Sequence, residues 1–296
     1  MSSHRHFNPW AFVLPGLIAG GVVLLVPVAQ ALWTSLHRLR MYRLHDQVWV
    51  GLDNYARLLQ DPLFHLSVRS TVVFSVGCTV LSVIAGLAVA SVMSTRGIRG
   101  TTAARFFMAF YLVPFVATQV VVGMMGRLYV WEPEYGLVNF VLGLFGTEGP
   151  MWLISRDTAM WATSVTNAWR LTPLAVLIFY AALATVPEEL LESAEVDGAG
   201  GWRSLVSIKL PLIQYHIGFV ALIQLTSAFR EFDTIFALTG GGPGRITNVL
   251  SLLVYNEGIG NSDMGMANAI SFTMLIIVGV LSLIYMRFAR LGELGK

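Results

Sequence analysis

Long apolar stretches separated by short polar connections run through all 296 residues of the chain. At about 1.5 Å per residue, an apolar helix of about 20 residues spans the hydrocarbon core of a bilayer. None of the stretches alternates apolar and polar residues as the strands of a membrane β-barrel do. The pattern therefore predicts six transmembrane helices, at about residues 10–36, 68–94, 104–131, 158–185, 211–237 and 267–289.

Composition agrees with a membrane location, because 55% of the residues are hydrophobic and only 12% are charged. Soluble domains carry about 25% charged residues, so the apolar excess must face lipid. The first stretch, from Trp10 to Trp33, exceeds the apolar core of about 7–15 residues in a cleavable signal peptide, and we expect a retained helix. A net charge of +2 does not suggest nucleic-acid binding. The fold class is thus predicted to be all-α, polytopic and membrane-embedded.

Orientation is read from the positively charged connections, which favour the cytoplasm. The connection from Ser94 to Arg105 and the C-terminal tail are rich in arginine and lysine, so both are expected there together with the N-terminus. The connection 132–157 is acidic, which suits the outside. The first connection disagrees, because this topology places outside the residues Arg38, Arg40, Arg43 and Arg57.

Catalytic and ligand-binding motifs are missing from the sequence, which contains no HExxH, GxSxG or phosphate loop GxxxxGK[ST]. Its six histidines have no metal-ligand spacing, and the lone Cys78 sits in an apolar run, as a small buried side chain does. The glycine-rich segment 240–244 lacks a phosphate-binding lysine and predicts a turn after the fifth helix. We expect the chain to bind no cofactor or metal and to hydrolyse no ATP by itself.

The polar segment from Thr185 to Pro211 is the most informative part of the sequence. Thr185 and Glu188 have the spacing of a capping box, and Pro187 suits a first helical turn. Leu190, Leu191 and Ala194 share one face of the predicted helix, and its acidic residues lie near the other face. Gly198 is predicted to end this helix, and a second one from Trp202 to Lys209 is predicted to stop at Pro211.

Acidity decides between two interpretations of this segment. A loop lying on lipid headgroups normally carries basic residues. Here only Arg203 and Lys209 oppose five acidic residues, namely Glu188, Glu189, Glu192, Glu195 and Asp197. A protein partner is therefore favoured over the membrane surface.

The same segment resembles the EAA loop of permeases from ATP-binding-cassette importers. The matching triplets are Glu192-Ser193-Ala194 and Asp197-Gly198-Ala199, followed by Ile208-Lys209-Leu210-Pro211, with Ser193 in place of the usual alanine. The resemblance implies that a coupling loop at about 186–211 docks on an ATP-hydrolysing subunit. It implies coupling roles for Glu188, Glu192, Ala194, Asp197, Gly198, Ala199, Ile208 and Pro211.

Two further segments, 51–64 and 232–256, resemble permeases for disaccharides, oligosaccharides and glycerol-phosphate-type solutes. The resemblance implies a tail, first helix and external segment at 1–66, a permease domain at 67–290 and a cytoplasmic tail at 291–296. It also implies a bilayer location in the plasma (inner) membrane of a prokaryote. The implied partners are a second homologous permease, two ATP-binding subunits that hold ATP and magnesium, and an extracytoplasmic solute-binding protein.

Polar side chains within the fourth and fifth predicted helices require an explanation, because they are costly in a membrane. Hydrogen-bonding groups beside an aromatic ring suit a sugar. One hypothesis is that they border a solute path, and its residues are Asn167, Trp169, Arg170, Gln224 and Arg230. The alternative is that Arg230, Glu231 and Asp233 lie near the outer interface or pair to hold helices together.

Two other functions compete with an importer permease. An ion-coupled secondary transporter would use Glu231 and Asp233 as coupling carboxylates, but it would need matching inverted halves, which Pro114 and Pro173 do not define. A polytopic membrane enzyme would need a nucleophile or metal constellation, and the sequence shows no motif for one.

Overall fold

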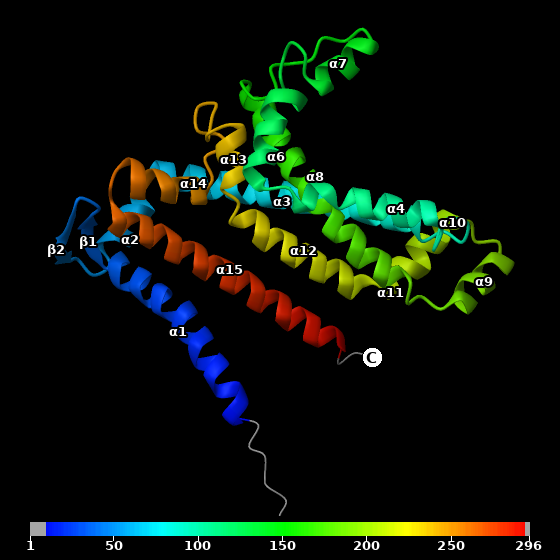
Figure 1. Ribbon diagram of the computed structural model, residues 1–296, viewed down its shortest axis with the longest axis horizontal. Coiled ribbons are helices and arrows are strands. Elements are labelled where there is room, and N and C mark those ends of the chain that lie inside the picture. Colours follow the sequence, from blue (N-terminus) through cyan, green and yellow to red (C-terminus); the bar gives the residue numbers. More distant parts are fainter. Residues whose placement is uncertain (1–9, 294–296) are drawn as a thin grey trace, which may run out of the picture. The chain divides into compact units, whose positions relative to one another are not determined.

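The computed structural model describes residues 10–293, which are mostly helical (Figure 1). The N-terminal tail with His4, Arg5 and His6, and the final residue Lys296, lie outside the described residues. The chain divides into two compact units, one formed by residues 1–61 and 253–276 and the other by residues 62–252 and 277–296.

Three described helices are long and apolar enough to cross a membrane alone, over Val13–Ser35, Pro62–Met93 and Met264–Arg287. Three bent pairs of helices meet the same criteria when each pair is taken together. Counting each pair as one span gives up to six spans, and the predicted helical, membrane-spanning class is confirmed.

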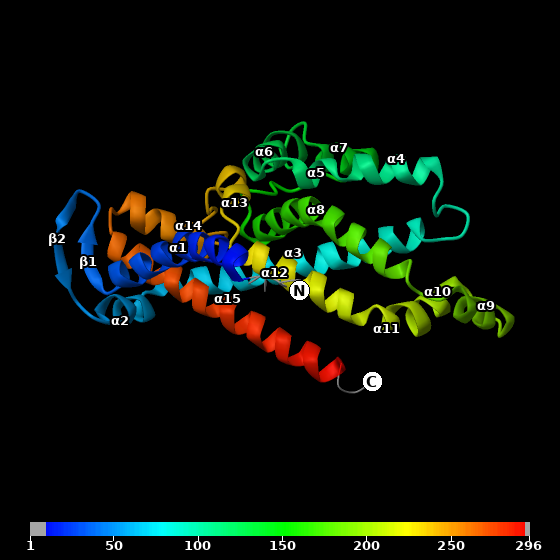
Figure 2. The ribbon, with the colours of Figure 1, turned by 60° about the horizontal axis from the view of Figure 1, so that its bottom comes forward.

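The first unit contains α1 (Trp10–Ser35), a hairpin of β1 (His37–Arg40) and β2 (Arg43–Trp49), α2 (Asp53–Gln60) and the start of α15 (Met264–Glu293). The hairpin strands are antiparallel and are visible with α2 in Figure 2. A hairpin was not expected, because its residues were treated only as a polar connection.

Ion pairs within this unit explain the arginines that conflicted with the charge rule. Arg38 pairs with Asp53 at 3.4 Å, and Asp263 accepts both Arg40 and Arg57 at 3.6 Å. Asp263 is 5% exposed, and a buried carboxylate needs compensating partners, which the two arginines provide. Three of the four arginines in the first connection are therefore neutralised by partners.

The second unit is built on α3 (Pro62–Met93) and α8 (Arg156–Leu183), which run side by side (Figure 1). Small residues allow this approach, since a Cβ on Gly86 would lie 2.6 Å from the Cβ of Ala175. Helix α12 (Gln214–Phe229) packs against both of them. The apolar core at their junction contains Val176, Phe179 and Ile213 among others.

The predicted single helix at 104–131 is wrong in detail. This stretch forms α4 (Thr102–Tyr111), α5 (Val113–Val116), α6 (Gln119–Met125) and a wide helical turn at Gly126–Val130, with a bend of 96°. Ala117 and Thr118 have extended backbones with ψ near 140°, which interrupts the helix. Apolar composition predicts the span but does not reveal this bend.

The predicted helix at 211–237 is also interrupted. Helix α12 ends at Phe229, and a separate α13 (Asp233–Leu238) follows after three residues. The glycine-rich turn 240–244 comes after α13, with positive φ at Gly240, Gly241 and Gly244. The unit also contains α7 (Leu137–Leu144), the start of α14 (Leu250–Tyr255) and the short helices of the loop after α8.

Candidate functional site

The polar loop after α8 begins with helix α9 (Glu188–Val196), which makes an angle of 77° with α8. Glu188 and Glu189 stand in its first turn, where the helix dipole stabilises negative charge. The expected capping box is wrong, because the Thr185 hydroxyl donates to the carbonyl of Ala182. Pro187 occupies the N-cap position rather than the first turn.

Gly198 ends α9 in the manner predicted. Its φ is +77°, a left-handed conformation that glycine adopts without steric strain. Its N–H donates to Glu195 O at 3.0 Å, and the N–H of Ala199 donates to Ala194 O at 2.8 Å. These two bonds form a Schellman motif, which fixes the direction in which the chain leaves the helix.

The second half of the loop is helical beyond the expected end. Helix α10 (Gly201–Ser204) continues through a wide turn at Leu205–Lys209 into α11 (Leu210–Leu212). Pro211 lies near the start of α11, where its missing N–H is tolerated, so it does not stop the helix at Lys209. The direction changes by 74° between this segment and α12.

Packing holds α9 through only part of its apolar face. Leu191 contacts the core formed by the end of α8 and the start of α12, and Ala194 is 9% exposed. Leu190 precedes Ala194 by four residues and shares its side of the helix, but it is 45% exposed, so that edge of the face is not packed. Apolar burial therefore fixes α9 along one narrow line.

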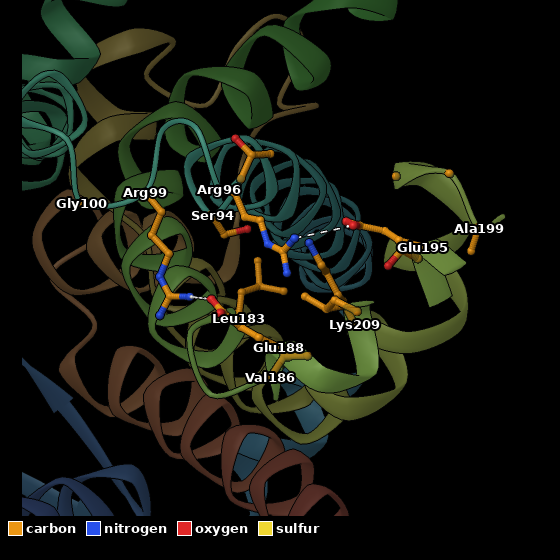
Figure 3. Close-up of a pocket in the computed structure, with 15 residues that line it drawn as sticks. Ser94, Arg96, Arg99, Gly100, Leu183, Val186, Glu188, Glu195, Ala199 and Lys209 are labelled. Carbon is orange, nitrogen blue, oxygen red and sulfur yellow. Dashed lines mark ion pairs between the residues drawn. The ribbon is translucent and has the colours of Figure 1, made fainter. Parts of the chain in front are cut away.

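Ion pairs fix the acidic side of α9. Arg96 pairs with Glu192 at 2.9 Å and with Glu195 at 3.5 Å, and Arg99 pairs with Glu188 at 3.7 Å. Figure 3 shows both arginines reaching from the connection after α3 toward the loop. The sequence comparison of the loop's acidic residues with Arg203 and Lys209 alone missed these partners.

A cavity of about 790 Å³ lies between this connection and the loop, lined among others by Arg96, Arg99, Glu188, Glu195 and Lys209 (Figure 3). Arg96 and Arg99 of the connection face Glu195 and Glu188 of the loop across the cavity. The cavity is therefore a crevice with charged side chains on both sides, where two segments of the same chain meet.

The residues assigned to coupling differ in accessibility. Exposed side chains are available for a partner, whereas Ala194 packs inward and Ala199 and Ile208 are half-buried. The exposed members of the set are Glu188, Glu192, Asp197, Gly198 and Pro211.

A second polar site surrounds a buried ion pair between α8 and the break after α12. Arg170 donates to Glu231 at 2.9 Å, and the side chains are 9% and 1% exposed. Asn167, fully buried, accepts from Nε and Nη2 of Arg170 at 3.2 and 3.1 Å. Such a pair is stable only with its remaining hydrogen bonds satisfied, which Asn167 provides in part.

A cavity of about 410 Å³ opens beside this pair and is lined by Phe115, Gln119, Arg170, Leu171, Leu174, Ile223, Gln224, Ser227, Arg230, Glu231, Phe232 and Asp233. Gln224 is fully buried, donates to Leu171 O at 3.3 Å and contacts the hydroxyl of Ser82. The guanidinium of Arg230 is exposed, and its Nε donates to Thr226 O at 3.3 Å. Two arginines and two carboxylates leave the lining with no net charge.

The structure brings together three of the five candidate path residues, Arg170, Gln224 and Arg230. Asn167 supports Arg170 from the protein side, and Trp169 is 48% exposed and outside the lining. Sequence reasoning named Glu231 as an interface or pairing group, or as a coupling carboxylate of the alternative transporter, and did not identify its partner. It also missed Phe115 and Gln119, which gave no signal because they stand in an ordinary apolar stretch.

Comparison with known proteins decides what kind of molecule carries these two sites. Residues 82–293 match the family described as binding-protein-dependent transport system inner membrane component. The chain belongs to this family. It is a membrane permease component, and ATP hydrolysis in such a system resides in partner subunits rather than in this chain.

Two relatives and one solved structure illustrate the similarity. The chain is 32% identical to the trehalose/maltose transport system permease protein MalF of Thermococcus litoralis, over 95% of this chain and 93% of that protein. It is 31% identical to the sn-glycerol-3-phosphate transport system permease protein UgpA of Agrobacterium fabrum, over 95% of this chain and 94% of that protein. A chain of a bacterial importer of alginate shares the fold, with a TM-score of 0.78 and 21% identity. The match covers 95% of this chain and 94% of that chain.

Proposed function

We propose that this permease forms half of the path for a sugar and that residues 186–211 dock on a partner ATP-binding subunit. The observation that carries the first part is similarity along almost the whole chain to a trehalose/maltose permease, at 32% identity. The family description adds dependence on a binding protein. We infer that the complete importer contains two ATP-binding subunits, a second homologous permease and an external solute-binding protein. ATP and magnesium belong to the ATP-binding subunits.

The docking role rests on what the loop exposes. It presents two short helical segments outside the packed helices α3, α8 and α12, with Glu188, Glu192 and Asp197 accessible. The Schellman turn gives this projection a fixed direction. A partner that closes around the loop could therefore move α8 and α12, which adjoin its two ends, as rigid bodies.

The loop must face the compartment that holds ATP, so both termini are assigned to the cytoplasm. The first connection then lies outside in spite of its arginines. Their pairing with Asp53 and Asp263 supports this placement, because a folded external segment with compensated charges carries little excess positive charge.

The 410 Å³ cavity is assigned to the solute path. Phe115 and Phe232 offer aromatic surfaces, and Gln119, Ser227 and Arg230 offer hydrogen-bonding groups. A sugar requires both, since its hydroxyl groups need partners and its apolar face packs on rings. The balanced charge of the lining suits an uncharged sugar better than an anionic solute.

Alanine variants of the reconstituted importer test the path assignment, with trehalose and maltose as probes. Gln224→Ala and Arg230→Ala should lower the uptake rate or raise the apparent KM, while Trp169→Ala, outside the cavity, should match wild type. Equal uptake by all three variants would exclude this cavity from the path. Docking is tested separately by purifying the tagged chain: an ATP-binding subunit should remain bound to it and be lost on deletion of residues 188–204.

A further inference from the structure

The connection between α3 and α4, residues 94–101, lies beside the docking loop. We propose that Arg96 and Arg99 are positioning residues that set the angle of α9 on α8 and link α9 to the start of α4. This inference rests on the proposed docking function for its consequence in transport. Its structural part concerns this chain alone.

Arg99 holds both sides of the bend that separates α8 from α9. One terminal nitrogen lies 3.5 Å from the carbonyl oxygen of Ala184, at the end of α8, and the other lies 3.7 Å from Glu188, the first residue of α9. A cation is favoured at a helix C-terminus and beside a carboxylate, so both contacts are electrostatically attractive. One side chain therefore spans the 77° change of direction.

Arg96 holds the remaining length of the helix. Its guanidinium pairs with Glu192 and Glu195, and the contact with Glu192 at 2.9 Å is a short charged hydrogen bond. Glu188, Glu192 and Glu195 follow one another at spacings of four and three residues. They form one stripe along α9 that faces the connection.

Exposure makes each of these pairs weak alone, since the five side chains are 41–64% exposed. Three pairs from one short segment onto one helix face form a network, in which a side chain ordered by one partner meets the next at lower entropic cost. The apolar contacts of α9 through Leu191 and Ala194 prevent it from leaving the surface but leave rotation about that line unopposed. The arginines oppose this rotation.

The connection also supplies a route for force. It joins the end of α3 to α4, which opens the bent span 102–130. A partner that displaces α9 would then act on α8 through the chain and on α4 through Arg96 and Arg99. The loop would move two spans together rather than one.

A spin label on α9 tests positioning without any partner. Val196 is 88% exposed at the end of α9, and the only native cysteine, Cys78, is fully buried, so Val196→Cys gives a single accessible label site. In the purified full chain, the double variant Arg96→Gln/Arg99→Gln should reduce the immobile fraction of the label by about two- to fivefold, because each exposed pair contributes little.

Two matched variants separate positioning from general disturbance. Arg105→Gln removes a positive charge from an exposed position at the start of α4 that has no ion pair within residues 10–293, so the label should match wild type. Arg96→Lys/Arg99→Lys retains both charges and should restore most of the immobile fraction. Equal mobility in the Arg96→Gln/Arg99→Gln and Arg105→Gln variants would overturn the inference.

Retention of the ATP-binding subunit by the tagged chain connects the inference to function. The Arg96→Gln/Arg99→Gln variant should retain less subunit than wild type, and the lysine variant should recover it. Unchanged retention alongside a mobile label would overturn the functional part. A wild-type chain that retains no ATP-binding subunit would instead refute docking, while the label result would still decide the positioning of α9.

Discussion

Gly198 is the position where the loop depends most on a single residue type. Its φ of +77° costs a residue with a side chain about 1–2 kcal/mol, and a β-branched residue is less tolerant still. A Cβ at Gly198 would meet no heavy atom within 4 Å. Crowding therefore adds nothing to this cost. Because about 1.4 kcal/mol corresponds to a factor of ten in an equilibrium constant, Gly198→Val should lower the ratio of loops with the Schellman turn to loops without it by about ten-fold or more.

Gly200 supplies the matched control. It lies two residues further along the same loop, a Cβ added there would also meet open space, and its φ is an ordinary −66°. Gly200→Val therefore adds the same side chain without the left-handed strain. Gly198→Asn is a second control, because asparagine tolerates the left-handed region better than other side chains.

The assay measures the ATP-binding subunit that co-purifies with each variant, together with the amount of variant in the membrane. Gly198→Val should insert normally and retain less subunit than Gly200→Val, with Gly198→Asn between Gly198→Val and wild type. Equal retention by Gly198→Val, Gly200→Val and wild type would refute the role given to the left-handed turn.

Three further predictions concern stability and are measured by thermal unfolding in detergent. Gly86→Val should destabilise the chain by about 1–3 kcal/mol, because its Cβ would lie 2.6 Å from that of Ala175; unchanged unfolding would contradict the close packing of α3 on α8. Glu231→Ala should destabilise it by about 3–5 kcal/mol by leaving Arg170 buried without its carboxylate, and the added change Arg170→Met should recover much of the loss. Asp263→Ala should lower the unfolding temperature by leaving two arginines unpaired in the first unit, and an equal effect of the exposed Asp46→Ala would remove the reason given.

Membrane spans were predictable because length and apolar composition are sufficient to specify them. The helices from Trp10, Pro62, Arg156 and Met264 lie within a few residues of their predicted stretches, except that Pro62–Met93 starts earlier. Bends were not predictable in this way. A stretch remains apolar whether its backbone is helical or, as at Ala117, extended.

In the loop after α8, features set by neighbouring residues were predictable from the sequence, whereas contacts with distant residues were not. Its left-handed turn at Gly198 was predictable, because glycine after an amphipathic helix is a local signal. Arg96 stands 96 residues before its partner Glu192, and no local pattern relates the two. The capping box failed for a local reason instead: the helix begins at Glu188 with Pro187 at the N-cap, so Thr185 lies before the cap and its hydroxyl donates to Ala182 O.

The sequence located polar residues within the spans but did not show which of them pair. Arg170 and Glu231 come from separate elements, and only the fold brings their atoms to 2.9 Å. Trp169 adjoins Arg170 in sequence, yet successive helical residues point about 100° apart, and it lies outside the cavity. The assignment of coupling and path residues remains a prediction for the experiments above.

The ion pairs of α9 also determine how quickly a partner could find the loop. With Arg96 and Arg99 against its glutamates, the surface has little field to attract a partner from a distance, and its most exposed large apolar side chains are Val196 and Trp202. Encounter would then proceed at an ordinary diffusional rate, nearly independent of ionic strength, and the lifetime of the complex would depend on burial of these apolar groups. Trp202→Ala should accordingly raise the dissociation rate while leaving the association rate unchanged, and a strong salt dependence of association would contradict this view.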